Sequence, residues 1–92
     1  MPRWYPVDSH PGGASHEPWY LAGDVLVFRS SGHADGPSAQ PEFRIDGGAV
    51  YPTEHHPTGA SAQAWFTIVG TMVYPAAGHP SGVSYAPWYQ AR

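Results

Sequence analysis

Residues 70–92 read GTMVYPAAGHPSGVSYAPWYQAR, and residues 47–69 read GGAVYPTEHHPTGASAQAWFTIV. These two stretches are identical at nine of 23 aligned positions. A spacing of 23 residues recurs along the whole chain in three identical columns: His10, His33, His56 and His79; Gly13, Gly36, Gly59 and Gly82; Ser15, Ser38, Ser61 and Ser84. A fixed internal period indicates a repeat architecture. We therefore divide the chain into four units (1–23, 24–46, 47–69 and 70–92) that form a single domain, 1–92.

A 23-residue unit is shorter than a helix pair of ~34 residues or a propeller blade of ~40 residues, but it fits two short strands. Eleven prolines and eleven glycines oppose helices. Runs of β-branched and aromatic residues predict the strands. The first strand of each unit is expected at Arg3–Pro6, Val25–Arg29, Ala49–Pro52 and Met72–Pro75, and the second at Trp19–Ala22, Glu42–Ile45, Trp65–Ile68 and Trp88–Ala91.

The connections between these runs alternate in length. Short ones at Ala22-Gly23, Asp46-Gly47 and Val69-Gly70 predict tight hairpin turns. The others are wide, as from Ser30 to Ala39, and are rich in turn-forming residues. Met1 and Arg92 occupy the columns of a tight turn, so Trp88–Ala91 should pair with Arg3–Pro6. The chain is thus expected to be an all-β, closed, pseudo-four-fold ring or shallow barrel of eight antiparallel strands.

Alternation along a strand sorts side chains between two faces. An uncharged face of the second strands is the expected core: Tyr20, Phe43, Phe66, Tyr89, Ala22, Ile45, Ile68 and Ala91. The opposite face has tryptophan in three units and Glu42 in the second unit, so we expect it to be partly wet. In the first strands, a valine column and a tyrosine column alternate, and the sequence leaves open which one is buried.

Composition excludes several classes. The net charge is −3, with four arginines and no lysine. A chain without a basic stripe is not expected to bind nucleic acid. There is no cysteine for a disulfide. No signal peptide and no apolar run of ~18 residues are present, so neither secretion nor a membrane span is expected, and a cytoplasmic location is the default. The oligomeric state is left open.

The predicted ring resembles the four-fold β-flower proteins, small chains built from repeated aromatic hairpins. The resemblance rests on Val27-Phe28, Val50-Tyr51 and Val73-Tyr74, on the turns at Gly36, Gly59 and Gly82, and on the returning Phe43, Phe66 and Tyr89. It implies a closed ring of four hairpins with no established activity. It also implies a shallow apolar bowl that would take a lipid or small molecule.

Aromatic residues suggest a repeated binding site for a small molecule or glycan. Trp19, Trp65 and Trp88 would stack on a sugar ring or another flat ligand, beside Tyr5, Tyr51 and Tyr74. The serines Ser15, Ser38, Ser61 and Ser84 would add hydrogen bonds. In the alternative interpretation, the tryptophans seal the junctions between hairpins and the serines bond loop backbone. The repeat would then serve folding or assembly, with no ligand.

The histidine column allows a third hypothesis. His10, His33, His56 and His79 around one axis would hold a divalent transition metal such as Zn²⁺, Cu²⁺ or Ni²⁺. Alternatively, each imidazole bonds the backbone of its own loop. Catalysis is not expected, because a serine nucleophile needs a base and an orienting acid. Acidic residues do not recur with the repeat: Asp8, Asp35 and Glu54 are scattered.

Overall fold

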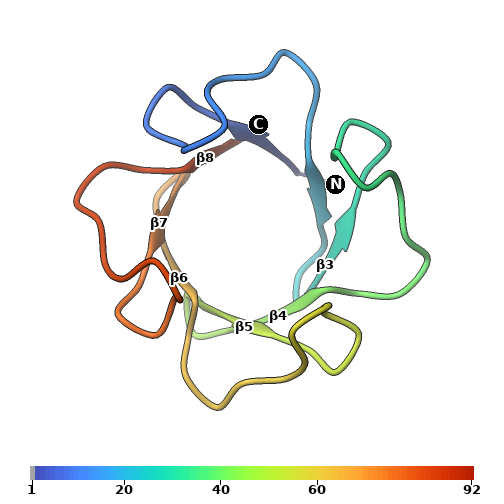
Figure 1. Cartoon of the computed structure of the whole chain (residues 1–92), viewed down its shortest axis with the longest axis vertical. Helices are drawn as coiled ribbons and strands as arrows, with labels where there is room; N and C mark the ends of the chain where they lie inside the picture. Colours follow the sequence, from blue (N-terminus) through green and yellow to red (C-terminus); the bar gives the residue numbers. More distant parts are fainter. Residues whose placement is uncertain (1) are drawn as a thin grey trace.

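The computed structural model describes residues 2–92 as an all-β barrel that is wider than it is tall, with principal extents of 31 × 31 × 22 Å. Eight antiparallel strands form one closed sheet in the order of the sequence (Figure 1). This confirms the predicted ring of hairpins. The strands are β1 (Arg3–Pro6), β2 (Tyr20–Ala22), β3 (Leu26–Arg29), β4 (Phe43–Asp46), β5 (Ala49–Pro52), β6 (Phe66–Val69), β7 (Met72–Pro75) and β8 (Tyr89–Ala91).

The barrel closes between the first and last strands, as predicted. In the β1–β8 pair, Trp4 lies opposite Ala91 and Pro6 opposite Tyr89. Next to this pair, the Arg3 N–H donates to the Arg92 carbonyl (3.0 Å) and the Arg92 N–H donates to the Arg3 carbonyl (2.9 Å). Closure leaves the sheet without an unpaired edge strand.

Several predicted strand boundaries are wrong by one residue. β3 begins at Leu26 and not at Val25, and β4 and β6 end one residue later than predicted. The second strands begin after, and not at, the tryptophan column, so Trp19 precedes β2 and Trp65 precedes β6. The tight turns also lie later than predicted, by one position at Gly47-Gly48 and by two at Asp24-Val25, where the Gly23 N–H donates to Leu26 O. Gly47 and Gly48 both have positive φ (59° and 81°), because the ladder continues to the Asp46–Ala49 pair. Positive φ at both central positions is the requirement of a type I′ hairpin turn, which glycine meets without strain.

The core lies inside the barrel and is formed by two rings of side chains. The predicted aromatic face is buried, with exposed fractions of 2–6 % at Tyr20, Phe43, Phe66 and Tyr89. The valine column of the first strands is also buried. The tyrosine column of the same strands lies on the outside of the barrel and is half-buried: Tyr5, Phe28, Tyr51 and Tyr74. Val27, Val50 and Val73 are 0 % exposed, and Trp4 takes their place in the first unit. The large Trp4 lies beside the small Ala91, whereas Val73 lies beside Ile68, so the alanine leaves room for the tryptophan.

The four wide loops follow β1, β3, β5 and β7 and radiate from the ring in Figure 1. Their backbones share hydrogen bonds that recur every 23 residues. In the first loop, the His10 N–H donates to Val7 O (2.9 Å), Gly13 N–H to His10 O (2.8 Å) and Ser15 N–H to Pro6 O (3.2 Å). Within residues 2–92 there is no helix that is both long and apolar enough to cross a membrane.

Candidate functional site

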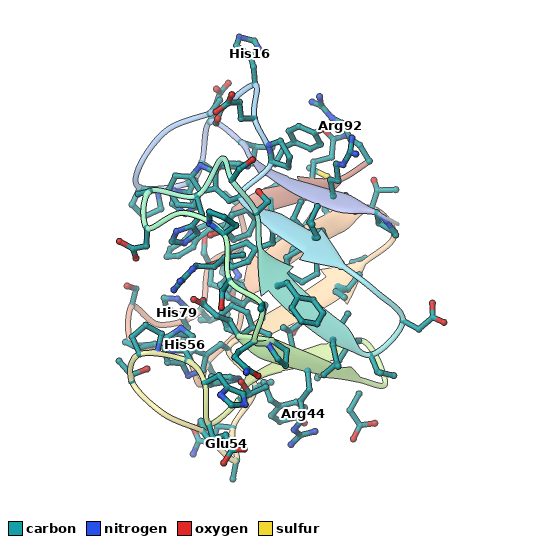
Figure 2. All side chains as sticks on the ribbon, turned by 90° about the vertical axis from the view of Figure 1, so that its right-hand side faces the viewer. His16, Arg44, Glu54, His56, His79 and Arg92 are labelled. Carbon is teal, nitrogen blue, oxygen red and sulfur yellow. The ribbon has the colours of Figure 1, made fainter. Side chains whose placement is uncertain are left out.

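The loop histidines turn back from the wide loops onto one end of the barrel. Each imidazole lies against a core ring of a strand: the centroid distances are 5.1 Å for His10–Tyr89, 5.3 Å for His33–Tyr20, 5.2 Å for His56–Phe43 and 5.2 Å for His79–Phe66. Figure 2 shows His56 and His79 on this loop-bearing side of the molecule. The loops are therefore at the rim, while their histidine rings cover the core.

Tryptophans fill the intervals between successive histidines. Trp19 lies between His10 (4.9 Å) and His33 (5.1 Å), with both contacts edge-on. Trp65 and Trp88 fill two further intervals in the same way, at 4.6–5.0 Å from the histidines on either side. The fourth interval holds Glu42. We call these eight residues the His–Trp ring: His10, Trp19, His33, Glu42, His56, Trp65, His79 and Trp88.

Each imidazole bonds the backbone of its own loop. This is the alternative to metal binding that the sequence analysis gave for the histidine column. Each Nδ1 accepts the backbone N–H two residues later, as from Gly12 to His10 (2.9 Å) and from Ser81 to His79 (3.0 Å). An accepting Nδ1 places the proton of a neutral imidazole on Nε2. His10 Nε2 then donates to the Tyr89 hydroxyl (3.1 Å), and His33 Nε2 to the Tyr20 hydroxyl (3.3 Å).

This arrangement does not support the predicted metal site at His10, His33, His56 and His79. A tryptophan or Glu42 separates each histidine from the next, and Nδ1 is occupied by a backbone N–H. Within residues 2–92, no three histidine, aspartate or glutamate side chains lie in a group that could hold a metal ion. The structure thus does not bring the four imidazoles together as ligands.

Glu42 is more deeply buried than its counterparts in the tryptophan column, since Trp19, Trp65 and Trp88 are half-buried, as expected for a partly wet face. Its side chain is 4 % exposed, and its Oε2 accepts from Arg29 Nη1 at 2.7 Å. The second oxygen, Oε1, lies 4.0 Å from His56 Nε2. A buried carboxylate needs such a partner because desolvation of an unpaired charge is costly. The sequence pattern placed Glu42 correctly in the tryptophan column, but Arg29 is what keeps it buried.

Burial also shifts the titration of the ring. It lowers the pKa of His10, His33, His56 and His79 below the usual value of 6.5, because the charged imidazolium loses hydration. At His56 the Glu42 carboxylate opposes this shift. Burial raises the pKa of the Tyr20 and Tyr89 phenols well above their usual range, so both hydroxyls keep their protons.

The four serines bond the backbone of their own loops, which is the alternative to ligand binding that the sequence analysis gave. Ser15 Oγ donates to Glu17 O (3.1 Å) and accepts from the Glu17 N–H (3.0 Å). Ser38, Ser61 and Ser84 make the same pair of bonds with the residue two positions later. Each hydroxyl proton is thereby used by loop backbone, and the serine can offer a ligand only a remaining lone pair.

The predicted joint tryptophan–tyrosine surface does not form. Trp19, Trp65 and Trp88 lie in the His–Trp ring, whereas Tyr5, Tyr51 and Tyr74 are half-buried on the outer wall of the barrel. Two of these tyrosines are covered by a guanidinium: Arg44 lies 4.3 Å from the Tyr51 ring centroid and Arg92 4.8 Å from that of Tyr5. Within residues 2–92, no such cation covers Tyr74.

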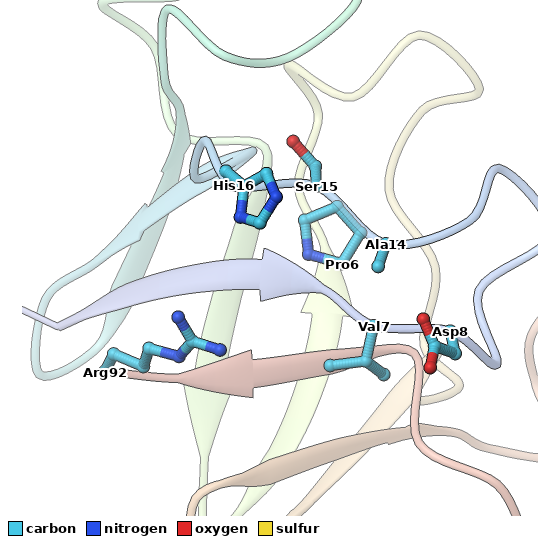
Figure 3. A pocket seen from close by; sticks show the side chains of 7 residues that line it. All are labelled: Pro6, Val7, Asp8, Ala14, Ser15, His16 and Arg92. Atoms are coloured by element: carbon cyan, nitrogen blue, oxygen red, sulfur yellow. The ribbon is translucent and has the colours of Figure 1, made fainter.

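Within residues 2–92, concave grooves lie on the outer wall at equivalent positions of three units. Each lies between a first strand and the wide loop that follows it. The first-unit groove has a volume of about 270 Å³ and is lined by Pro6, Val7, Asp8, Ala14, Ser15, His16 and Arg92 (Figure 3). The fourth-unit groove measures about 420 Å³ and includes Tyr74, Val83, Ser84 and Tyr85. The second-unit groove, at about 710 Å³, includes Arg3, Phe28, Arg29 and Ser38.

Sequence reasoning found Tyr74 and the serines of these grooves but missed the residue at their rim. That position is His16 in the first unit and Tyr85 in the fourth, where the side chain is 96 % exposed. The sequence did mark this position, because the residue directly after the recurring serine differs between units. It is His16, Ala39, Ala62 and Tyr85 in the four units. The grooves thus share a backbone and differ in chemistry.

No protein-family model, no curated protein and no solved structure matches this chain. The resemblance to the β-flower proteins therefore stays a prediction.

Proposed function

We propose that this protein is a non-catalytic binding module whose outer grooves take small molecules with a flat apolar face, such as sugars. The main supporting observation is that a groove of the same construction occurs in three units. Aromatic side chains on a groove wall offer a flat ligand a large contact area at little cost in conformational entropy. Since the side chains of the grooves differ, each groove would select its own ligand within this class.

The fourth-unit groove is the best candidate for the principal site. Tyr74 lies in its wall, where no arginine of the described residues covers it, and Tyr85 lies at its rim. Val69 and Val83 in the same lining are 61 % and 62 % exposed. Exposed apolar residues gathered at one concave place favour a ligand contact. A sugar or aromatic ring in this groove would cover both valines and stack on tyrosine.

The test is a titration followed by amide NMR shifts, with glucose, cellobiose, indole and octanoate as probes. We expect at least one of these probes to shift the amides of Val83, Ser84 and Tyr85. The variant Tyr85→Ser should weaken that binding about fivefold or more, since stacking is worth roughly 1 kcal/mol or more. Val25→Ser, at an exposed valine of a tight turn outside the groove, is the matched control. Shifts absent with all four probes would overturn the proposal.

A structural or assembly role without a ligand is the second candidate. It is favoured by the serine hydroxyls and the histidine Nδ1 atoms, which bond the backbone of their own loops, and by Nε2 of His10 and His33, which bond core tyrosines. Replacing all four ring histidines by asparagine tests this candidate. A barrel that stays folded and assembled, in a protein that also binds none of the probes, would support it.

A further inference from the structure

The second-unit groove differs from the others in charge. Two of the four arginines of the chain, Arg3 and Arg29, contribute to its lining. Its other lining residues are apolar or hydroxyl-bearing, and none is acidic: Pro18, Leu21, Phe28, Ser30, Ser31, Pro37 and Ser38. A concentration of positive charge in one groove is unexpected in a chain of net charge −3.

Arg29 is held in a fixed position at this groove. Its Nη1 donates to Glu42 Oε2 (2.7 Å) and its Nε donates to Gly36 O (3.0 Å). A guanidinium has five N–H donors, so these two bonds leave others for a ligand. The side chain is 20 % exposed, which allows such contact. A guanidinium that is already ordered loses little further entropy on binding an anion.

Arg3 provides a second cation across an apolar wall. It lies opposite Leu21 in the β1–β2 pair, and Leu21 lies opposite Phe28 in the β2–β3 pair. The three side chains therefore form one row over three strands. Glu42 neutralises the charge of Arg29, whereas Arg3 is exposed, so the groove keeps a net positive charge.

From this geometry we propose that the second-unit groove binds an acidic saccharide: a sugar ring that carries a carboxylate or phosphate group. The anion would be recognised by Arg3 and Arg29, and the ring would pack on Leu21 and Phe28. The inference rests on the proposed binding function and specifies the ligand of one groove. It predicts that grooves of one barrel differ in ligand, with charge selected here and apolar contact in the fourth unit.

The experiment compares D-glucuronate, glucose 6-phosphate, glucose and inorganic phosphate in NMR titrations of the intact protein. The two charged sugars should shift the amides of Leu21, Ser31 and Ser38 and bind about tenfold more tightly than glucose, as expected for a charge-assisted hydrogen bond. Their affinity should fall as salt increases. The carboxylate and phosphate arms identify the preferred anion. Inorganic phosphate binding as tightly as glucose 6-phosphate would overturn recognition of the sugar body.

Two variants assign the binding to this groove. Arg3→Gln should weaken glucuronate binding about tenfold while glucose binding is unchanged. Arg44→Gln is the matched control, since it removes the same charge from an exposed arginine outside this groove. The double variant Arg29→Pro, Glu42→Trp removes the second cation without leaving Glu42 buried and unpaired. Combined with Arg3→Gln, it should weaken glucuronate binding more than Arg3→Gln alone.

Equal affinities for glucuronate and glucose, or equal loss in Arg3→Gln and Arg44→Gln, would overturn this inference. If this inference fails but glucose or another neutral probe binds in the fourth-unit groove, the proposed binding function is still supported. If no probe shifts amides in any groove, the proposed function fails as well.

Discussion

Arg29 Nη1 lies 2.7 Å from Glu42 Oε2, and the two residues replace a proline and a tryptophan of the other units. Arg29 aligns with Pro6, Pro52 and Pro75, and Glu42 aligns with Trp19, Trp65 and Trp88. The two differences from the repeat compensate each other. Glu42 in the His–Trp ring is tolerated because Arg29 reaches it, and Arg29 is ordered because Glu42 accepts its hydrogen bond.

This pairing predicts strong coupling between the two sites. Glu42→Ala and Arg29→Ala should each destabilise the protein by about 3 kcal/mol, because each leaves a buried or half-buried polar partner unpaired. The double variant Arg29→Pro, Glu42→Trp should be at least as stable as the natural chain, because it restores the pattern of the other units. Urea unfolding measures all four free energies. A double variant that is less stable than the natural chain would contradict this compensation.

The His–Trp ring predicts that stability falls in acid. The folded-state pKa of each ring histidine lies below the unfolded value of 6.5, so the unfolded chain binds more protons at intermediate pH. The free energy of unfolding should therefore be maximal above about pH 6.5 and decrease as pH falls through the lowered pKa values. Urea unfolding between pH 7.5 and 4.5 measures this slope.

Replacement of the four ring histidines by asparagine should reduce that slope, since asparagine offers an acceptor but does not titrate. His16→Asn, at an exposed loop position outside the ring, is the single-histidine control. A slope that is the same in the four-fold variant and in the natural chain would show that other groups cause the acid dependence.

The serine column predicts a separation of stability from binding. Ser84→Ala removes the two hydrogen bonds of Ser84 with Ala86 and should cost about 0.5–1.5 kcal/mol in unfolding free energy. The affinity of any probe for the fourth-unit groove should change less than twofold, because the hydroxyl proton is already used by the loop. Denaturation and NMR titration of the same sample measure both quantities. A large loss of affinity at unchanged stability would assign the hydroxyl to the ligand.

Barrel closure predicts that the chain can be permuted. In the permutant, two glycines replace residues 1–2 between Arg92 and Arg3, and the new ends lie between Gly47 and Gly48. This design should fold to the same barrel, because Arg3 and Arg92 already exchange two backbone hydrogen bonds. The far-ultraviolet circular dichroism spectrum should match that of the natural chain. A permutant that is unfolded, beside a folded parent, would contradict the equivalence of the two turns.

Much of the fold could be derived from the sequence because it depends on local signals that recur. The 23-residue period, the glycines near the tight turns and the alternation around Tyr20 and Phe43 predicted eight strands, closure and the core face. Exact boundaries were less determined, since both Asp46-Gly47 and Gly47-Gly48 satisfy turn chemistry. The ladder pair Asp46–Ala49 decides between them.

The sequence by itself determined the closed ring of hairpins and the aromatic core, because strand period and turn chemistry act within a few residues along the chain. Only the tertiary structure decided where the side chains beside that core lie. It turned the histidines inward, placed Trp19, Trp65 and Trp88 between them, and left Tyr74 on the outer wall. It also brought Arg29 to Glu42. These positions depend on contacts between different units, and a spacing in one unit does not determine the direction of a side chain toward another.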